Sequence, residues 1–223
     1  MTSDLGDRLA DVRFRIAEAA RRSGRSESDI TMIVVTKLQP IELVRELRAL
    51  GVEDFGENRH QEAREKAALL PDVRWHFVGQ LQGKKARQVR AYASAIHSVD
   101  RISLVHALDV AGERPANVFL QINLTDDPER GGAAPADAPA LTEAIAASSG
   151  LRLLGVMAVA PLGEEPRRAF ARLRGIADTV RRIVPEATAI SAGMSGDYQD
   201  AIAEGATHLR IGTAITGSRP ARA

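Results

Sequence analysis

Residues 32–51, with the sequence MIVVTKLQPIELVRELRALG, join a short apolar run to an amphipathic segment. Met32–Lys37 (MIVVTK) is rich in β-branched residues, which is typical of a strand buried on both faces. Gly51 supplies a stop for the helix predicted over Ile41–Leu50. The apolar residues of that helix recur at helical spacing, at Ile41, Val44, Leu47 and Ala49. This stretch therefore predicts one strand–helix unit of a parallel sheet.

The same alternation recurs along the whole chain. Further strands are predicted at Val52–Asn58, Arg74–Gln80, Ala95–Asp100, Asn117–Leu124, Leu151–Pro161, Thr188–Met194 and Thr207–Thr213. Helical segments lie between them, near residues 58–69, 83–93, 101–111, 138–148, 166–183 and 197–204. Roughly eight strands separated by helices predict an α/β fold, a single (β/α)8 TIM-type barrel formed by residues 1–223 as one domain. An open doubly wound sheet is the alternative, although such a sheet typically stops at fewer strands.

One more helix is predicted before the first strand. Its apolar residues recur at helical spacing, at Leu5, Leu9, Val12, Ile16 and Ala19. We expect this helix to fill the slot beside the eighth strand and to close the helical ring. Acidic residues interrupt this start, so it is not a signal peptide, which needs an apolar stretch of about 7–15 residues. No stretch approaches the roughly 18 apolar residues of a membrane span, so the expected location is cytoplasmic.

The composition excludes several classes of protein. The 223 residues include no cysteine, which excludes a disulfide scaffold, a Cys-ligated metal and thiol catalysis. A formal charge of +1 and an aromatic content of 4% provide neither the field nor the stacking platforms of a nucleic-acid binder. Basic runs at 84–90 and 167–174 lie on predicted helices and are expected to be solvated outer faces. No metal site is predicted, because no metal-binding spacing relates the histidines, which are His60, His76, His97, His106 and His208.

Polar residues collect where the predicted strands end, and in a closed barrel these carboxyl ends form the active site. The first strand ends in Lys37, whose apolar neighbours favour the neutral amine that Schiff-base chemistry requires. The last two strands are followed by Gly193–Gly196 (GMSG) and Arg210–Thr213 (RIGT), whose small residues and hydroxyls fit a phosphate cradle. A Schiff-base lysine beside a phosphate cradle is typical of a pyridoxal 5′-phosphate (PLP) pocket. A Schiff-base aldolase acting on a sugar phosphate needs the same two elements and stays open as an alternative.

Residues rich in Gly, Pro and Ala follow the fifth predicted strand. This segment, 126–139, has the sequence DDPERGGAAPADAP. It predicts a mobile loop, either a lid over a site or a plain surface loop.

Several stretches of the sequence together carry a resemblance to a known family. They are VVTKLQP (34–40), DFGENRHQEAREK (54–66), RWHFVGQLQGKKAR (74–87), HSVDR (97–101), GVMAVAP (155–161) and ISAGMSGDYQDAIAEGATHLRIGTAITGSRP (190–220). On these residues the chain resembles the pyridoxal-phosphate homeostasis protein family, relatives of the N-terminal barrel of alanine racemase. The resemblance runs from the first predicted strand to the last.

The resemblance implies a role for each matching position. Lys37 matches the lysine that holds PLP as a Schiff base. Arg210 matches the arginine beside the pyridine nitrogen, and Asn58 matches a residue that lines the cofactor face. The phosphate-binding positions of the family are matched by Ser195, Gly212 and Thr213.

Other matching positions are less specific. His76 and Ser191 lie in matching motifs and are assigned a lining role. The chain departs from the common pattern at Gln80–Gly83 and at Ala192. These departures put only the shape of the pocket rim in doubt.

The resemblance also implies a function, namely PLP homeostasis and cofactor delivery to PLP-dependent apoenzymes. An arginine at the ring nitrogen keeps that nitrogen unprotonated and makes PLP a weaker electron sink. Racemisation also needs a base opposite the lysine, which in alanine racemase-like enzymes is a tyrosine from a second domain. The tyrosines here, Tyr92 and Tyr198, both fall in predicted helices. We therefore expect a monomeric carrier with little or no turnover, and a PLP-dependent racemase-like enzyme is the alternative.

Overall fold

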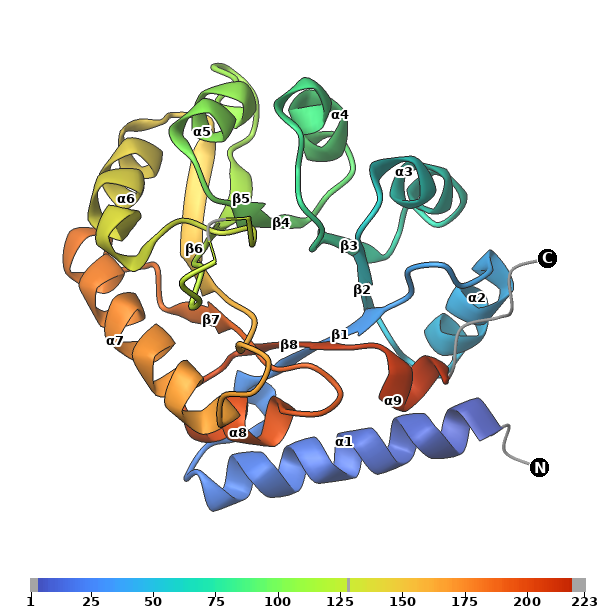
Figure 1. The fold of residues 1–223 in the computed structure, drawn as a ribbon. Coiled ribbons are helices and arrows are strands. Elements are labelled where there is room, and N and C mark those ends of the chain that lie inside the picture. The colour runs from blue at the N-terminus through green and yellow to red at the C-terminus, as the bar shows by residue number, and fades with distance from the viewer. Residues whose placement is uncertain (1–3, 128, 218–223) are drawn as a thin grey trace.

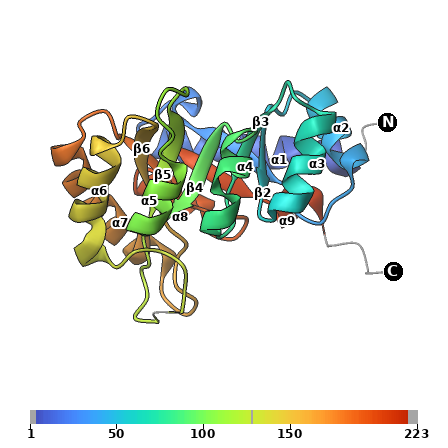
Figure 2. The ribbon, with the colours of Figure 1, turned by 90° about the horizontal axis from the view of Figure 1, so that it is seen from above.

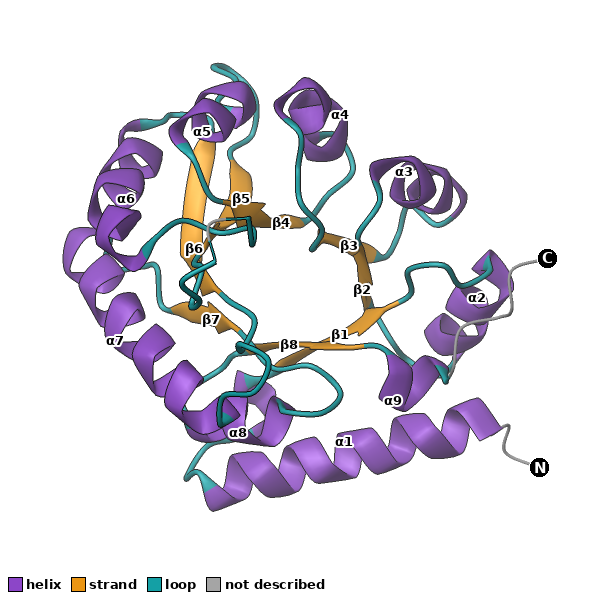
Figure 3. Cartoon of the chain, viewed as in Figure 1, coloured by secondary structure: helices purple, strands orange, loops and turns teal. Residues whose placement is uncertain are grey.

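The computed structural model describes residues 4–127 and 129–217. The strands of this part are β1 (Thr31–Val35), β2 (Asp54–Glu57), β3 (Arg74–Phe77), β4 (Ala95–Val99), β5 (Ala116–Gln121), β6 (Leu151–Met157), β7 (Ala189–Ser191) and β8 (His208–Ile211). Neighbouring strands pair in parallel and in chain order, and β8 pairs with β1, so the sheet closes into a barrel (Figures 1 and 3). This closure confirms the predicted (β/α)8 barrel and excludes the open sheet.

Helices surround the barrel as an outer layer (Figures 1 and 2). They are α1 (Asp4–Arg22), α2 (Ile41–Ala49), α3 (His60–Leu69), α4 (Ala86–Arg90), α5 (Ile102–Leu108), α6 (Ala138–Ala147), α7 (Pro166–Ile183), α8 (Tyr198–Ala203) and α9 (Thr213–Thr216). Every predicted helix is present, and the short α9 is one that the periodicity does not predict. The strands are shorter than predicted because their terminal polar residues belong to the loops that follow.

Helix α1 closes the ring of helices, as predicted. It packs against α8 and α9 (Figure 1). Its apolar face is buried. Arg8 Nε donates to the carbonyl oxygen of Ile215 in α9 at 2.7 Å. Arg25, just after α1, donates to the carbonyl oxygen of Ala206 at 2.7 Å. These bonds tie the start of the chain to the segments on either side of β8.

The strands are buried on both faces, but the two faces carry different side chains. Val34, Phe55 and Ile96 are fully buried and belong to the apolar cluster between barrel and helices. A second, smaller cluster contains Phe119, and the ring of His97 stacks on it with centroids 4.3 Å apart. Several polar side chains are also buried, among them His76, His97, Ser191 and Arg210. No described helix is long and apolar enough to cross a bilayer.

Candidate functional site

A cavity of about 490 Å³ opens at the carboxyl ends of β1, β2 and β8. All six residues that the sequence assigns to the cofactor site line it: Lys37, Asn58, Ser195, Arg210, Gly212 and Thr213. The remaining lining residues are Val35, Gln39, Val78, Val159, Met194, Gly196, Thr216 and Gly217. The fold therefore brings together residues from both halves of the chain at the edge where a barrel places its active site.

Lys37 lies two residues beyond the end of β1 and is half-buried. The turn that carries it is held by Thr36 N, which donates to Gly56 O at 3.0 Å, and by Gln39 N, which donates to Thr36 O at 3.0 Å. No described residue forms a hydrogen bond or ion pair with the Lys37 amine. The amine is therefore available to a ligand in the cavity.

The loops after β7 and β8 meet at a second wall of the cavity. Ala214 N donates to Ser195 Oγ at 3.2 Å, which joins the two loops. Gly193 has φ +92, and a Cβ there would lie 2.8 Å from Tyr198 Cα, so this turn requires glycine. Within the described residues, no acceptor receives a hydrogen bond from the backbone N–H groups that remain, those of Ser195, Gly196, Gly212 and Thr213. Unpaired N–H groups at a concave surface form an anion-binding site.

Arg210 lies in β8 and is 6% exposed. One guanidinium nitrogen donates to Ser191 Oγ at 2.6 Å, and another donates to the carbonyl oxygen of Ala158 at 2.8 Å. Burial lowers the pKa of Arg210 to about 10, so the side chain stays charged at neutral pH. The guanidinium has five donors, and its remaining N–H groups are left for a ligand in the cavity that Arg210 lines.

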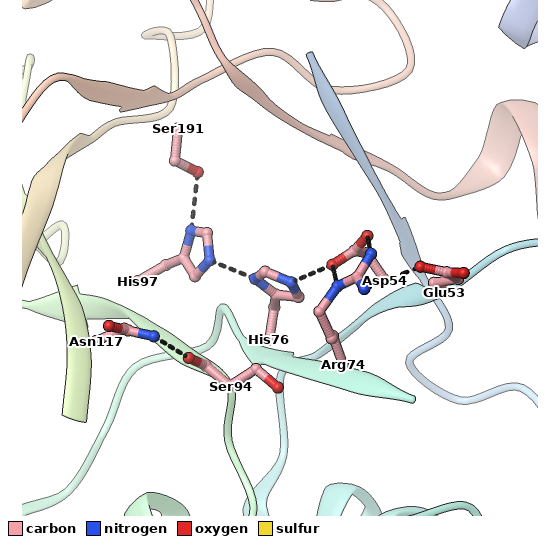
Figure 4. Close-up of polar contacts among 8 residues, drawn as sticks. All are labelled: Glu53, Asp54, Arg74, His76, Ser94, His97, Asn117 and Ser191. Atoms are coloured by element: carbon pink, nitrogen blue, oxygen red, sulfur yellow. Dashed lines mark hydrogen bonds and ion pairs between the residues drawn. The ribbon is translucent and has the colours of Figure 1, made fainter. Parts of the chain in front are cut away.

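A chain of buried hydrogen bonds runs from Arg210 through Ser191 to the amino end of β2. Figure 4 shows its part from Ser191 to Asp54. Ser191 Oγ lies 2.9 Å from His97 Nδ1, His97 Nε2 lies 3.0 Å from His76 Nδ1, and His76 Nε2 lies 2.9 Å from Asp54. Arginine can only donate and a carboxylate can only accept. The bonds are therefore satisfied when each group donates toward Asp54, with both histidines neutral and protonated at Nε2.

The electrostatics of this chain favour that arrangement. Burial, which is the largest cause, and the positive charge of Arg210 hold the pKa of His97 well below its usual range. Burial alone would raise the pKa of Asp54, but hydrogen bonds from His76 and Arg74 lower it to about 2. An ionised Asp54 and a neutral His97 are the states that the chain requires.

The lining role assigned to His76 and Ser191 is wrong for this cavity. Neither side chain lines it, and both lie beneath it in the buried chain. The sequence also missed that His208 lies beside them, with its ring centroid 6.3 Å from that of His97. No described group of three or more His, Cys, Asp or Glu side chains has the geometry to hold a metal ion.

The segment after β5 belongs to a different depression. Asn123 Nδ2 donates to the carbonyl oxygens of Asp127 and Arg130, at 2.8 and 3.1 Å, and Ile122 pairs with Ala133. With the loop between β6 and α7, this segment lines a depression of about 1020 Å³. None of the described residues in 126–139 lines the cavity of Lys37, so a lid role is not evident there.

Comparison with known proteins shows the family of this chain. The family model for the N-terminal domain of alanine racemase matches residues 8–220, of which 218–220 lie outside the described residues. A pyridoxal phosphate homeostasis protein from Pseudomonas aeruginosa is 41% identical over 225 residues, which cover 97% of this chain and 96% of that protein. The structure of PipY from Synechococcus elongatus with PLP bound is 36% identical, with a TM-score of 0.84 over 96% of this chain and 100% of that one.

A more distant structure shares only the fold. Alanine racemase from Corynebacterium glutamicum has 15% identity and a TM-score of 0.75, over 96% of this chain and 62% of that chain. The fold, the cavity and the relatives all lead to one assignment. The chain belongs to the pyridoxal phosphate homeostasis protein family, within the wider family of the alanine racemase N-terminal domain.

Proposed function

We propose that this chain binds PLP in the 490 Å³ cavity, holds it by a Schiff base to Lys37, and takes part in PLP homeostasis and delivery. The observation that carries the proposal is the pairing of a free lysine amine with a set of free backbone N–H groups in one cavity. Its size lies within the range of about 300–1000 Å³ that is typical of cofactor pockets. Relatives named for PLP homeostasis and a PLP-bound structure of PipY support the choice of cofactor.

The donors in the cavity fit the two ends of this cofactor. Backbone N–H groups of the two loops and the hydroxyls of Ser195 and Thr213 would hold the phosphate. The Lys37 amine would condense with the aldehyde, forming a C=N bond and releasing water. When bound, PLP supplies an electron sink that stabilises carbanions. Asn58 would line the cofactor face.

Arg210 would face the ring nitrogen. Its guanidinium is held in place by Ser191 and Ala158 and remains charged. The guanidinium donates hydrogen bonds but keeps its proton, and it cannot accept a hydrogen bond from a protonated ring nitrogen. The ring nitrogen would therefore stay unprotonated. The cofactor would therefore be a weak electron sink here, which favours binding over catalysis.

We further propose that the protein turns over amino acids little or not at all. Lys37 and Arg210 are the titratable residues among those that line the cavity. Tyr92 lies beside His60, with Tyr92 Oη 3.4 Å from His60 Nδ1, and Tyr198 lies on α8. Neither tyrosine lines the cavity, so no described group stands opposite Lys37 as a second base. A monomer in the cytoplasm that hands PLP to apoenzymes is the role this favours.

Borohydride reduction followed by peptide mapping tests the proposal. Reduction of the PLP-loaded protein is expected to leave a pyridoxyl group on the peptide that contains Lys37. A sugar-phosphate aldolase would instead trap its substrate on that lysine and leave no pyridoxyl label. Transfer of PLP from the loaded protein to a PLP-dependent apoenzyme, followed by recovery of that enzyme's activity, tests delivery.

A further inference from the structure

A buried cluster of charged residues lies directly behind the turn that carries Lys37. Lys66 Nζ, on α3, donates to Thr36 O at 2.8 Å, Glu57 Oε1 at 2.7 Å and Glu62 Oε1 at 2.7 Å. These bonds use all three donors of the ammonium group. The side chains of Lys66 and Glu57 are only 7% and 2% exposed. We name Thr36, Glu57, Glu62 and Lys66 the Lys66 cluster.

Burying the charges of the Lys66 cluster carries a large desolvation cost. Removing a charged pair from water costs several kcal/mol per ion in real proteins, on the order of what the pair regains. Glu57 Oε2 has no hydrogen-bond partner among the residues that the structure describes. Burial raises the pKa of Glu57, and the charge of Lys66 opposes that rise. Stability alone therefore gives little reason for this arrangement.

The cluster holds both residues that flank Lys37. On one side, Thr36 O accepts from Lys66, and Thr36 Oγ1 donates to Glu57 Oε1 at 2.8 Å. On the other side, the backbone N–H of Leu38 donates to Glu62 Oε1 at 2.6 Å. Lys37 itself makes no such bond to any described residue, so its backbone is held from both sides while its amine is left unbonded within this part of the chain.

The contact between Leu38 and Glu62 involves a residue with an unusual backbone conformation. Its φ is +64°, and no other non-glycine residue in the described part of the chain has a positive φ. Such a conformation is unfavourable for a leucine and persists only where the surroundings enforce it. The Leu38 side chain is 37% exposed, so packing does not enforce it. Two hydrogen bonds hold it instead: the turn bond from Gln39 N to Thr36 O, and the bond from the Leu38 N–H to Glu62.

We propose that Glu62 and Lys66 are positioning residues that hold Thr36 and Leu38 so that the Lys37 amine points into the cavity. They act through the backbone and touch no ligand. The proposal rests on the proposed function for the Schiff base, but the strained turn exists without cofactor and can be tested without it.

Glu62→Ala tests the role of the Leu38 contact. The variant is expected to bind PLP about tenfold more weakly, since about 1.4 kcal/mol corresponds to a factor of ten. Pyridoxine 5′-phosphate, which has no aldehyde, is expected to bind the variant as it binds the wild type. Glu62→Gln keeps an oxygen acceptor and is expected to stay close to the wild type. Glu65→Ala is the matched control, since Glu65 is an exposed glutamate on the same helix.

Leu38→Gly provides the rescue. Glycine adopts a positive φ at little cost, so Leu38→Gly combined with Glu62→Ala is expected to recover most of the PLP affinity. A glutamate that only stabilises α3 would not be rescued in this way.

Hydrogen exchange of the cofactor-free protein gives the independent readout. Glu62→Ala is expected to speed exchange in the peptide spanning residues 36–39, because the Leu38 N–H loses its acceptor, whereas Glu65→Ala is not. Unchanged exchange there, equal weakening of both ligands, or failure of the glycine rescue would each overturn the positioning role. If the wild type forms no Schiff base at Lys37, the proposed function fails. Hydrogen exchange of residues 36–39 still decides whether Glu62 holds the backbone at Leu38.

Discussion

Arg210 donates a 2.6 Å hydrogen bond to Ser191 Oγ, and this bond joins the cavity to a buried polar chain that ends at Asp54. The interior of a TIM barrel is usually filled by apolar layers. Here two histidines and a serine replace part of that packing, and every bond has a defined direction. The hydrogen-bond chain therefore sets the orientation of the guanidinium that lines the cavity.

Removing the serine hydroxyl tests this coupling. Ser191→Ala deprives Arg210 of an acceptor and His97 of a donor, so we expect the free energy of unfolding to fall by about 1–3 kcal/mol. We also expect PLP affinity to fall about tenfold, as a freed guanidinium loses its orientation. Denaturant unfolding and a PLP titration measure the two effects. Ser98→Ala is the matched control, because Ser98 is a buried serine whose Oγ has no partner, and that variant should be neutral or slightly more stable.

The buried histidines predict acid sensitivity. Burial lowers the pKa of His208 from 6.5 to about 4, and burial also lowers the pKa of His97. Between pH 6.5 and about 4, the unfolded chain binds protons at these histidines that the folded chain does not bind. The free energy of unfolding therefore falls as the pH falls from 6.5 toward 4. Each such histidine contributes a slope of about 1.4 kcal/mol per pH unit. Below about pH 4, folded His208 is also protonated, and its contribution stops changing.

The matched variants for this pH profile are two histidine-to-asparagine substitutions. His208→Asn should flatten the dependence of the free energy of unfolding between pH 6.5 and 4. His106→Asn should leave it unchanged, because His106 is exposed on α5. Equal pH profiles for the wild type and His208→Asn would contradict a lowered pKa of His208 as a cause of the acid sensitivity.

Loss of the buried lysine should destabilise the fold. Lys66→Met leaves Glu57 as a buried, unpaired carboxylate, for which a loss of about 3–5 kcal/mol is typical. Combining it with Glu57→Gln removes that charge and is expected to recover much of the loss. Denaturant unfolding of the single and double variants measures this, and Lys84→Met, at an exposed lysine, serves as control. A double variant no more stable than Lys66→Met would show that charge burial is not the cause.

Glycine substitutions distinguish the tight turn at Gly193 from the more open position at Gly196 in the same loop after β7. Gly193→Ala puts a Cβ 2.8 Å from Tyr198 Cα at a residue with φ +92, so we expect destabilisation of about 1–3 kcal/mol. Gly196→Ala meets no atom within 4 Å and has no positive φ, so its thermal unfolding should match the wild type. The reverse order of stabilities would contradict the geometry of this loop.

The barrel, Lys37 and the two glycine-containing loops could be predicted from the sequence for a physical reason, whereas the individual roles of Asn58 and Arg210 are implied only by the family resemblance. Alternating β-branched runs and amphipathic helices are local patterns, and polar residues at the carboxyl ends of parallel strands converge in any closed barrel. The Lys66 cluster and the buried chain could not be predicted in the same way. Their partners come from separate strands and helices, as His97 and Ser191 do at 94 residues apart. In a strand buried on both faces, apolar and polar residues do not alternate along the sequence. The sequence therefore does not show which side chains point into the barrel.

The visible absorption spectrum of the PLP-loaded protein tests whether Lys37 forms the Schiff base. Wild-type protein loaded with PLP is expected to show the absorption band of a Schiff base, and Lys37→Ala is expected to lack it. Lys85→Ala is the control, because Lys85 lies in an adjacent depression that shares Asn58 with the cavity, and it should retain the band. A Lys37→Ala protein that folds and keeps the band would contradict the assignment of Lys37 as the residue that holds the cofactor.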